Sequence, residues 1–253
     1  TLSGWPVVPL FMNSFRIFSK ADEEGGEGGS QPSSSRASSS SSLRRLVSEK
    51  ATSLLSSITA TIRSIQRRGL AKRLEKVTAE SDMLLEDHVV FLMDSVPPRF
   101  KQQTWRLLYS TSKHGFSLQT FYRRVSNAFP TVLLVKDVRG SIFGAFATDP
   151  YMVQHKYYGT GETFVFKLHP DAEAYRWKYD KEKGSASQNQ NDFFLLSTED
   201  CIGFGGGGRF ALWIDQELLH GSSSCSPTFE GLERLSEEEN FTVQTIEVWS
   251  LGD

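Results

Sequence analysis

Four consecutive glycines, Gly205–Gly208, constrain the fold of this chain more than any other feature of its sequence. Glycine runs are typical of flexible linkers, but this one lies directly between two apolar runs, at 201–204 and 210–214, that have the composition of strands. Between strands, glycine is required where the backbone adopts a positive φ or where another segment passes closely. We therefore expect a tight turn without side chains that leads into a central strand containing Trp213.

A phosphate-binding loop is the competing interpretation of these glycines. A nucleotide-binding P-loop has the pattern Gly-x4-Gly-Lys-Ser/Thr, and a dinucleotide-binding loop has Gly-x-Gly-x-x-Gly at the start of a helix. Here no Lys-Ser/Thr pair follows the glycines, and the next residues favour a strand. The sequence therefore favours a loop that holds its own shape, and any function there comes from the backbone and Arg209 being presented to a partner.

Residues 1–42 are predicted to be a disordered leader. Residues 19–42 are rich in Gly, Ser and Glu and contain almost no apolar side chains, so burial cannot offset the entropy of ordering them. Residues 1–11 lack the basic segment and cleavage-site pattern of a signal peptide, and we interpret them as untranslated sequence or a disordered extension before Met12. No uninterrupted apolar run approaches about 18 residues, so we expect no transmembrane segment.

Residues 43–80 are predicted to form a basic amphipathic helix, because their apolar residues recur mostly three or four positions apart. The segment has nine basic and three acidic residues, a net charge of +6 against −8 for the rest of the chain. Gly69 is expected to kink or break the helix. Three interpretations stay open: a helix docked on its own domain or solvated, a helix that binds a partner, and a helix on a membrane surface.

Residues 82–253 are predicted to be an α+β domain. We expect a helix at 84–93 that ends before Pro97 and Pro98, and a helix at 117–127 capped by Ser117. A hairpin is expected at 131–147, with its turn at Asp137–Gly140. Residues 178–191 are expected to form a surface loop. Further strands are expected at 105–109, 162–168, 193–197, 210–214 and 241–249. Many short strands and few helices indicate a β-sandwich with helices at its edge.

Composition and motif spacing exclude several functional classes. The near-neutral net charge of −2 argues against a nucleic-acid-binding protein, and two cysteines are too few for a disulfide framework or a cysteine-based zinc site. His-Glu-x-x-His, Gly-x-Ser-x-Gly and Cys-x-x-Cys patterns are absent, so we expect no catalytic residues, no metal site and no cofactor. His114 and His220 each precede a glycine and are interpreted as structural turn residues. A hydrolase would instead require Glu162, Asp215 and His220 to converge in one cleft.

Three further side chains carry specific expectations. Cys225 follows a polar loop and is the candidate redox residue, with His220 as its only nearby cation, whereas Cys201 in a strand is expected to be inert. Glu247 alternates with apolar residues in its strand. If buried, it needs a partner such as Arg209 or backbone N–H groups, which makes a structural ion pair the first interpretation and a carboxylate that docks a partner the second.

Seven blocks along the chain, in order, resemble the TLDc domain family. They are Trp105–Arg123, Ile142–Phe146, Tyr158–Phe166, Gly205–Asp215, Leu219–Gly221, Cys225–Phe229 and Ile246–Trp249. The resemblance covers roughly residues 84–250 and does not include the leader or the basic helix. Ala211 stands where the family often has Gly, and Tyr151 stands where it often has Trp, both modest changes at apolar sites.

The resemblance implies a β-sandwich of two antiparallel sheets with flanking helices and a part in resistance to oxidative stress. It also implies binding to the vacuolar-type proton-pumping ATPase, through its peripheral stalk or catalytic head, with effects on the assembly or activity of that pump. We therefore expect a non-enzymatic interaction module, monomeric and cytoplasmic or at the vacuolar or lysosomal surface. The alternative is an antioxidant protein that acts directly through Cys225. The docking residues are expected on loops at one end of the sandwich: Gly206, Gly207, Gly208, Arg209, Asp215 and His220.

Overall fold

The computed structural model describes residues 37–177 and 191–252. Residues 1–36, most of the expected leader, and most of the expected surface loop, at 178–190, lie outside the described residues. By its internal contacts the chain divides into two units, Thr1–Thr59 and Ala60–Asp253. The second unit contains the sandwich and the residues that position the candidate site.

Helix α1 runs from Ala37 to Glu80 and contains the basic segment. It begins six residues before the helix start expected at 43, so residues 37–42 are helical. It also continues through Gly69, so the predicted break there is wrong. A single glycine costs a helix about 1 kcal/mol relative to alanine, and good helix formers on both sides offset that cost.

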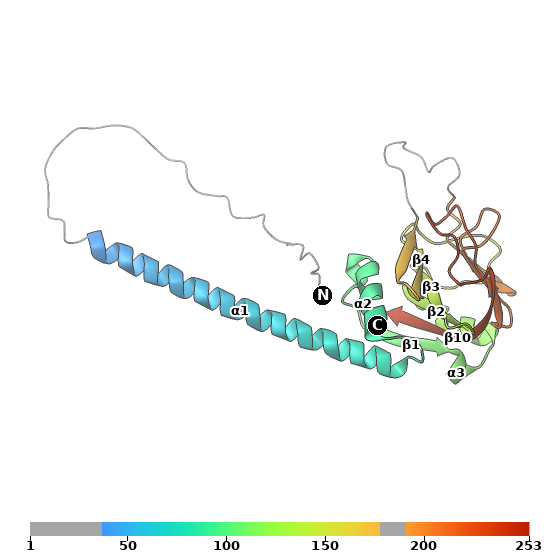
Figure 1. The fold of residues 1–253 in the computed structure, drawn as a ribbon, viewed down its shortest axis with the longest axis horizontal. Helices are drawn as coiled ribbons and strands as arrows, with labels where there is room; N and C mark the ends of the chain where they lie inside the picture. The colour runs from blue at the N-terminus through green and yellow to red at the C-terminus, as the bar shows by residue number, and fades with distance from the viewer. Residues whose placement is uncertain (1–36, 178–190, 253) are drawn as a thin grey trace, which may run out of the picture. The chain divides into compact units, whose positions relative to one another are not determined.

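Within the described residues, ten strands form two antiparallel sheets that share one strand (Figure 1). The first sheet has the order β5-β4-β3-β2-β10-β1, and the second has the order β10-β9-β8-β7-β6. The strands are β1 (Trp105–Ser110), β2 (Thr131–Asp137), β3 (Ile142–Ala147), β4 (Phe164–His169), β5 (Glu173–Arg176), β6 (Leu195–Ser197), β7 (Cys201–Phe204), β8 (Leu212–Asp215), β9 (His220–Ser222) and β10 (Asn240–Leu251).

Strand β10 joins the two sheets. Its residues 240–242 pair with β9 in the second sheet, whereas residues 243–251 pair with β2 and β1 in the first. The flanking helical segments are α2 (Glu86–Ser95), a 3-10 turn at Pro98–Phe100, α3 (Thr111–His114) and α4 (Leu118–Val125). The expected α+β sandwich with helices at its edge is confirmed.

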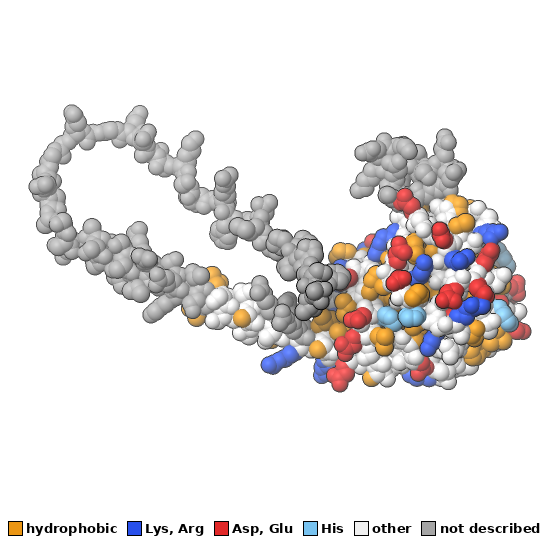
Figure 2. All heavy atoms as spheres, in the orientation of Figure 1, with side chains coloured by type: hydrophobic (Ala, Val, Ile, Leu, Met, Phe, Trp, Pro, Cys, Tyr) orange, Lys and Arg blue, Asp and Glu red, His pale blue; other side chains and the backbone are white. Residues whose placement is uncertain are grey.

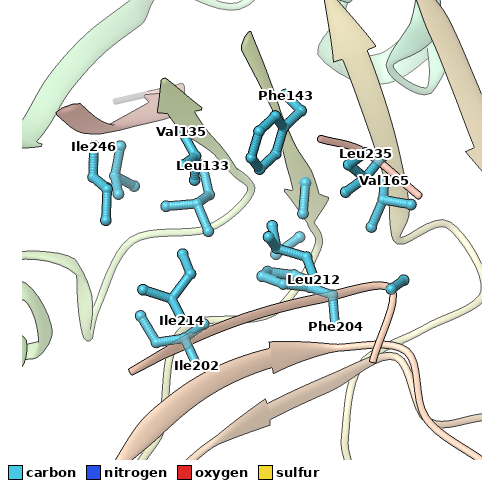
Figure 3. Close-up of a cluster of buried hydrophobic side chains, with 14 of the residues drawn as sticks. Leu133, Val135, Phe143, Val165, Ile202, Phe204, Leu212, Ile214, Leu235 and Ile246 are labelled. Carbon is cyan, nitrogen blue, oxygen red and sulfur yellow. The ribbon is translucent and has the colours of Figure 1, made fainter. Parts of the chain in front are cut away.

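One core cluster fills the space between the sheets (Figure 3). Leu133 and Phe143 of the first sheet point toward Leu212 and Ile214 of the second, and all four side chains are fully buried. Alternation along the strands produces this arrangement, since every second residue faces the partner sheet. Burial of each such side chain contributes roughly 1.5–3 kcal/mol.

A second cluster covers the opposite face of the first sheet. Leu74 and Val77 at the end of α1 pack there with Val89 and Leu92 of α2 and with Trp249 of β10. Sheets with one solvated face alternate apolar and polar residues, whereas β2 and β3 are buried on both faces and are apolar nearly throughout. The end of α1 therefore belongs to the core of the sandwich unit.

The expected hairpin at 131–147 is confirmed, and Asp137 shapes its turn. The buried Asp137 carboxylate accepts the N–H groups of Arg139 and Ser141, each at 2.9 Å, and Gly140 has a φ of 95°. An aspartate that bonds to the backbone two residues ahead is a common way to start a turn, and glycine supplies the left-handed conformation.

Ser117 caps α4 as expected, because its hydroxyl accepts the N–H of Thr120 at 3.3 Å. The helix ends at Val125, two residues earlier than predicted. Strands β5 and β9 were not predicted, since three of four β5 side chains are not buried and His-Gly-Ser in β9 contains no strand-forming residue. No helix among the described residues is long and apolar enough to cross a membrane.

Candidate interaction site

The glycine loop between β7 and β8 requires glycine at several positions. Gly205, Gly207 and Gly208 have φ values of 75°, 95° and 126°, which favour glycine. A Cβ atom on Gly206 would lie 2.7 Å from the Tyr157 hydroxyl oxygen and 2.8 Å from a ring carbon of Phe193. The expected need for glycine is therefore met, but the connection between β7 and β8 spans seven residues, 205–211, and is a loop and not a tight turn.

Hydroxyl and amide side chains hold this loop in place. The N–H of Gly206 donates to Ser226 Oγ and Thr228 Oγ1, both at 3.1 Å, and its carbonyl accepts from Ser226 Oγ and from Asn191 Nδ2. A phosphate-binding loop directs free N–H groups at its ligand. The Gly206 N–H already donates to oxygens of the protein and is not free to bind a phosphate. The geometry therefore supports a loop that is held by internal hydrogen bonds.

The outer part of the loop is open to solvent. A Cβ atom on Gly208 would meet nothing within 4 Å, and the Arg209 side chain is 60% exposed. Arg209 forms an ion pair with Glu239 and a longer hydrogen bond to Ser224. Surface ion pairs contribute at most about 1 kcal/mol, so a partner carboxylate can compete for this guanidinium. The loop thus presents the backbone at Gly208 and the cation of Arg209 together at the protein surface.

Asp215 organises the turn between β8 and β9. Its carboxylate accepts the N–H of Leu219 at 2.9 Å and lies 3.2 Å from Nδ1 of His220. Leu218, which lies between Asp215 and Leu219 in the sequence, is fully buried and has a φ of 58°, a conformation that non-glycine residues rarely adopt. Backbone strain of this kind costs about 1–3 kcal/mol and persists only where surrounding contacts impose it.

The six predicted docking residues do not lie at one end of the sandwich. In the hairpin of β7 and β8, Phe204 pairs with Leu212 beside the glycine loop, whereas Cys201 pairs with Asp215 at the other end. Gly206–Arg209 and the Asp215–His220 turn are therefore separated by the length of β8. The expectation of one shared end is wrong, because the glycine loop precedes a strand that carries the chain away before Asp215 is reached.

An open cavity of about 810 Å³ lies at the Asp215 end, and sequence reasoning did not find it. Leu118, Tyr122 and Leu219 contribute apolar surface, and Glu199 and Glu217 contribute acidic groups. The Tyr122 hydroxyl donates to the carbonyl oxygens of Thr198 and Cys201, which fixes one wall. The residues that line this cavity come from separate segments of the chain, so no local sequence pattern predicts the cavity.

The hydrolase arrangement is not assembled. Glu162 lies just before β4 of the first sheet, and its carboxylate accepts two hydrogen bonds from Arg99, which lower its pKa. Asp215 and His220 contact each other in the second sheet. Within residues 37–177 and 191–252, no group of three or more His, Cys, Asp or Glu side chains could hold a metal ion.

Glu247 is buried, but its partners differ from the predicted ion pair. Its side chain is fully enclosed and accepts hydrogen bonds from Ser81 Oγ and the Asp82 N–H, both at 2.7 Å, and from Trp249 Nε1 at 2.9 Å. Burial raises the pKa of this carboxyl, and these hydrogen bonds oppose that rise. Arg209 bonds to Glu239 instead, so the expected ion pair is wrong and the backbone N–H alternative is correct.

The two cysteines differ in exposure. Cys225 is exposed, as expected, whereas Cys201 is half-buried with its sulfur 3.3 Å from Thr198 Oγ1. The expected nearby cation of Cys225, His220, instead contacts Asp215. His114 accepts the Ser110 N–H at its Nδ1 atom, which agrees with a structural turn histidine.

Comparison with known proteins agrees with this architecture. Residues 77–252 match the family model described as the TLDc domain. Oxidation resistance protein 1 of Rattus norvegicus and of Homo sapiens are each 42% identical to this chain over 172 residues, which is 67% of this chain and 19% and 18% of those proteins. Nuclear receptor coactivator 7 of Mus musculus is 39% identical over 170 residues, 66% of this chain and 17% of that protein. The chain thus spans less than a fifth of the length of the relatives it matches.

Proposed function

The chain belongs to the TLDc domain family, and from this premise we propose that it is a non-enzymatic interaction module that binds the vacuolar-type proton-pumping ATPase. Through that contact it regulates the assembly or activity of the pump and contributes to resistance against oxidative stress. The names of its relatives support the stress-resistance part of this proposal. The expected site of action is the cytoplasm or the vacuolar or lysosomal surface, where a monomer meets the peripheral stalk or catalytic head.

The glycine loop is the observation that carries the proposal. Ser226, Thr228 and Asn191 hold Gly206 from the inside, so the exposed outer part of the loop is ordered before any partner arrives. Ordering a loop on binding reduces affinity, and a preorganised loop avoids that cost. Arginine is enriched at the centres of protein interfaces, which makes Arg209 the residue we expect to contribute most.

The Asp215–His220 turn is a second, separate contact in this proposal. Its acidic and apolar cavity differs chemically from the glycine loop, which offers backbone and a cation. Because β8 separates the two surfaces, one small partner segment is not expected to contact both. A large assembly with several subunits can contact them independently.

The test is capture of the pump on immobilised protein with charge-reversed variants. Arg209→Glu is expected to reduce recovery of pump subunits roughly tenfold, since an interface arginine commonly contributes more than 1 kcal/mol. Arg139→Glu is the matched control, because Arg139 is also an exposed arginine and pairs with Glu237 and Glu238, next to the Glu239 partner of Arg209. Recovery by Arg209→Glu at the level of the wild type and of Arg139→Glu would remove the glycine loop from the interface. Absence of pump subunits with the folded wild-type chain would overturn the function itself.

A further inference from the structure

Helix α1 has two apolar faces with different environments. Leu74 and Val77 are 8% and 2% exposed and pack into the core of the sandwich unit. Further toward the N-terminus, four large apolar side chains remain open to solvent. Leu54, Leu55, Ile58 and Ile65 are 64%, 64%, 55% and 62% exposed. Figure 2 shows hydrophobic side chains at the surface of the coloured part of the helix. Exposed apolar surface of this kind marks an interaction site when it is contiguous.

The exposed face is not an extension of the face that packs on the sandwich. At 3.6 residues per turn, successive side chains are about 100° apart around the helix axis. Leu54, Ile58 and Ile65 then fall within an arc of about 40°, whereas Leu74 and Val77 fall on an arc centred roughly 150° away. The two stripes lie on different sides of one helix, so the exposed stripe has a role other than completing the core.

Basic residues continue the exposed face toward the C-terminal end of the helix. Lys72 and Lys76 occupy the same arc as Leu54 and Ile58, Arg68 lies about 40° beyond its edge, and all three cations are exposed. Residues 54–62 contain no charge, and residues 63–76 contain six basic residues and one acidic residue. One side of α1 is therefore mainly apolar over 54–65, where Thr61 is its polar member, and cationic over 68–76.

A second copy of the same helix is a poor occupant for this face. Leu55, Ile58 and Ile65 fit the apolar positions of about two heptads, but coiled coils usually sustain the pattern over at least about three or four heptads. Each copy would also bring a net charge of +5 from residues 54–76 to its partner. Like charges along paired helices are destabilising.

A negatively charged lipid surface fits both parts of the face. An amphipathic helix lies in the interface with its apolar side among the acyl chains and its basic side chains at anionic headgroups. The Thr59 hydroxyl donates to the carbonyl of Leu55 at 2.8 Å, so this polar group is satisfied within the helix. The chain outside residues 54–76 has a net charge of −7, which would be repelled by such a surface.

We propose that the face of α1 formed by Leu54, Ile58, Ile65, Arg68, Lys72 and Lys76 binds anionic lipid membranes. The apolar part inserts into the headgroup and acyl boundary, and the three cations contact lipid phosphates or carboxylates. Because the stripe that packs on the sandwich lies on another side of the helix, membrane binding leaves that packing intact. This function is independent of pump binding.

Cosedimentation of the full chain with vesicles tests the proposal. The wild-type protein is expected to bind phosphatidylcholine vesicles that contain phosphatidylserine much more tightly than vesicles of phosphatidylcholine alone. The variant Arg68→Gln, Lys72→Gln, Lys76→Gln is expected to lose on the order of 100-fold in affinity for the anionic vesicles, because each cation near an anionic surface contributes about fivefold. Raised salt should weaken wild-type binding in the same direction.

The apolar contribution is tested by Leu54→Ser, Ile58→Ser and Ile65→Ser in one chain, which should also abolish binding. The matched control is Arg106→Gln, Arg123→Gln, Arg124→Gln, which removes three exposed arginines that line another cavity on the sandwich unit. This control should bind anionic vesicles like the wild type. Loss of binding in the control alone would overturn the proposal and assign the lipid contact to the sandwich.

Two other results would also overturn it. The first is a wild-type chain that does not bind anionic vesicles but forms dimers, while the variant with Leu54→Ser, Ile58→Ser and Ile65→Ser does not form dimers. The second is a wild-type chain that does not bind the vesicles, together with a serine variant that no longer captures pump subunits. That result would make the face a protein-binding surface. Vesicle binding without pump capture would leave this proposal standing and remove only the proposed function.

Discussion

The two ends of strand β8 are both closed by tight loops, but different forces give them their shape. At the glycine end, the backbone takes conformations that favour glycine and is crowded by Tyr157 and Phe193. At the other end, a leucine adopts a left-handed conformation because Asp215 fixes the turn around it. One loop is specified by the absence of side chains, and the other by the presence of a single carboxylate.

This difference separates two routes to a fixed surface loop. Steric specification is spread over the crowded glycines, so it can be damaged at Gly205, Gly206 or Gly207. Specification by a carboxylate is concentrated in one residue, so substitution of its neighbours should have little effect. Substitutions in the two loops therefore distinguish the two routes.

Gly206→Val should have the largest effect on stability. The new side chain would overlap the Tyr157 hydroxyl and the Phe193 ring, and overpacking of a buried site costs about 3 kcal/mol when the neighbours cannot move. Urea unfolding measures the loss. Gly208→Ala is the control in open space, where only backbone strain of about 1–2 kcal/mol is expected. A Gly206→Val chain as stable as the Gly208→Ala chain would contradict steric specification.

Asp215→Ala should cost about 1–2 kcal/mol, because the Leu219 N–H loses its acceptor and the strained backbone at Leu218 loses its restraint. Asp215→Asn keeps an oxygen for that N–H and should recover part of the loss. The same urea titration distinguishes them. Equal destabilisation by both substitutions would show that charge, and not the backbone hydrogen bond, holds this turn.

Arg209→Glu and His220→Ala should each change stability by less than about 1 kcal/mol, since both side chains are mostly exposed. Their effects on binding should differ. Arg209→Glu is expected to reduce capture of pump subunits more than His220→Ala, because the glycine loop is the preorganised surface. The reverse order would move the principal contact to the Asp215 end.

Cys225→Ser should have the smallest effect of all. The side chain is exposed, so unfolding is expected to stay within about 0.5 kcal/mol of the wild type. Cells that express this variant should retain their protection from peroxide if the protein acts through binding. Loss of protection by a folded variant would instead support direct thiol chemistry.

The sequence predicted most of the sandwich, because alternating apolar residues and turn residues are local signals. It predicted where glycine is needed for the same reason, since few residues other than glycine adopt positive φ values readily. It could not predict the conformation of Leu218, because tertiary contacts impose it on a residue that avoids it. The burial of Glu247 was accessible from the strand pattern, but its partners at Ser81 and Asp82 lie about 165 positions away in the chain.

Strand β10 has a consequence for how this protein is made. Among the described residues it is the last strand, yet it pairs with the first of them, β1, contributes to both sheets and brings Glu247 to Ser81 and Asp82. During synthesis the chain emerges from its N-terminus, so neither sheet can be completed while residues 240–251 remain inside the ribosome. We expect both halves of the core to stay exposed in the nascent chain until residues 240–251 have left the ribosome. Chaperone contact should therefore continue until this strand emerges and fall once β10 has paired with β1 and β2.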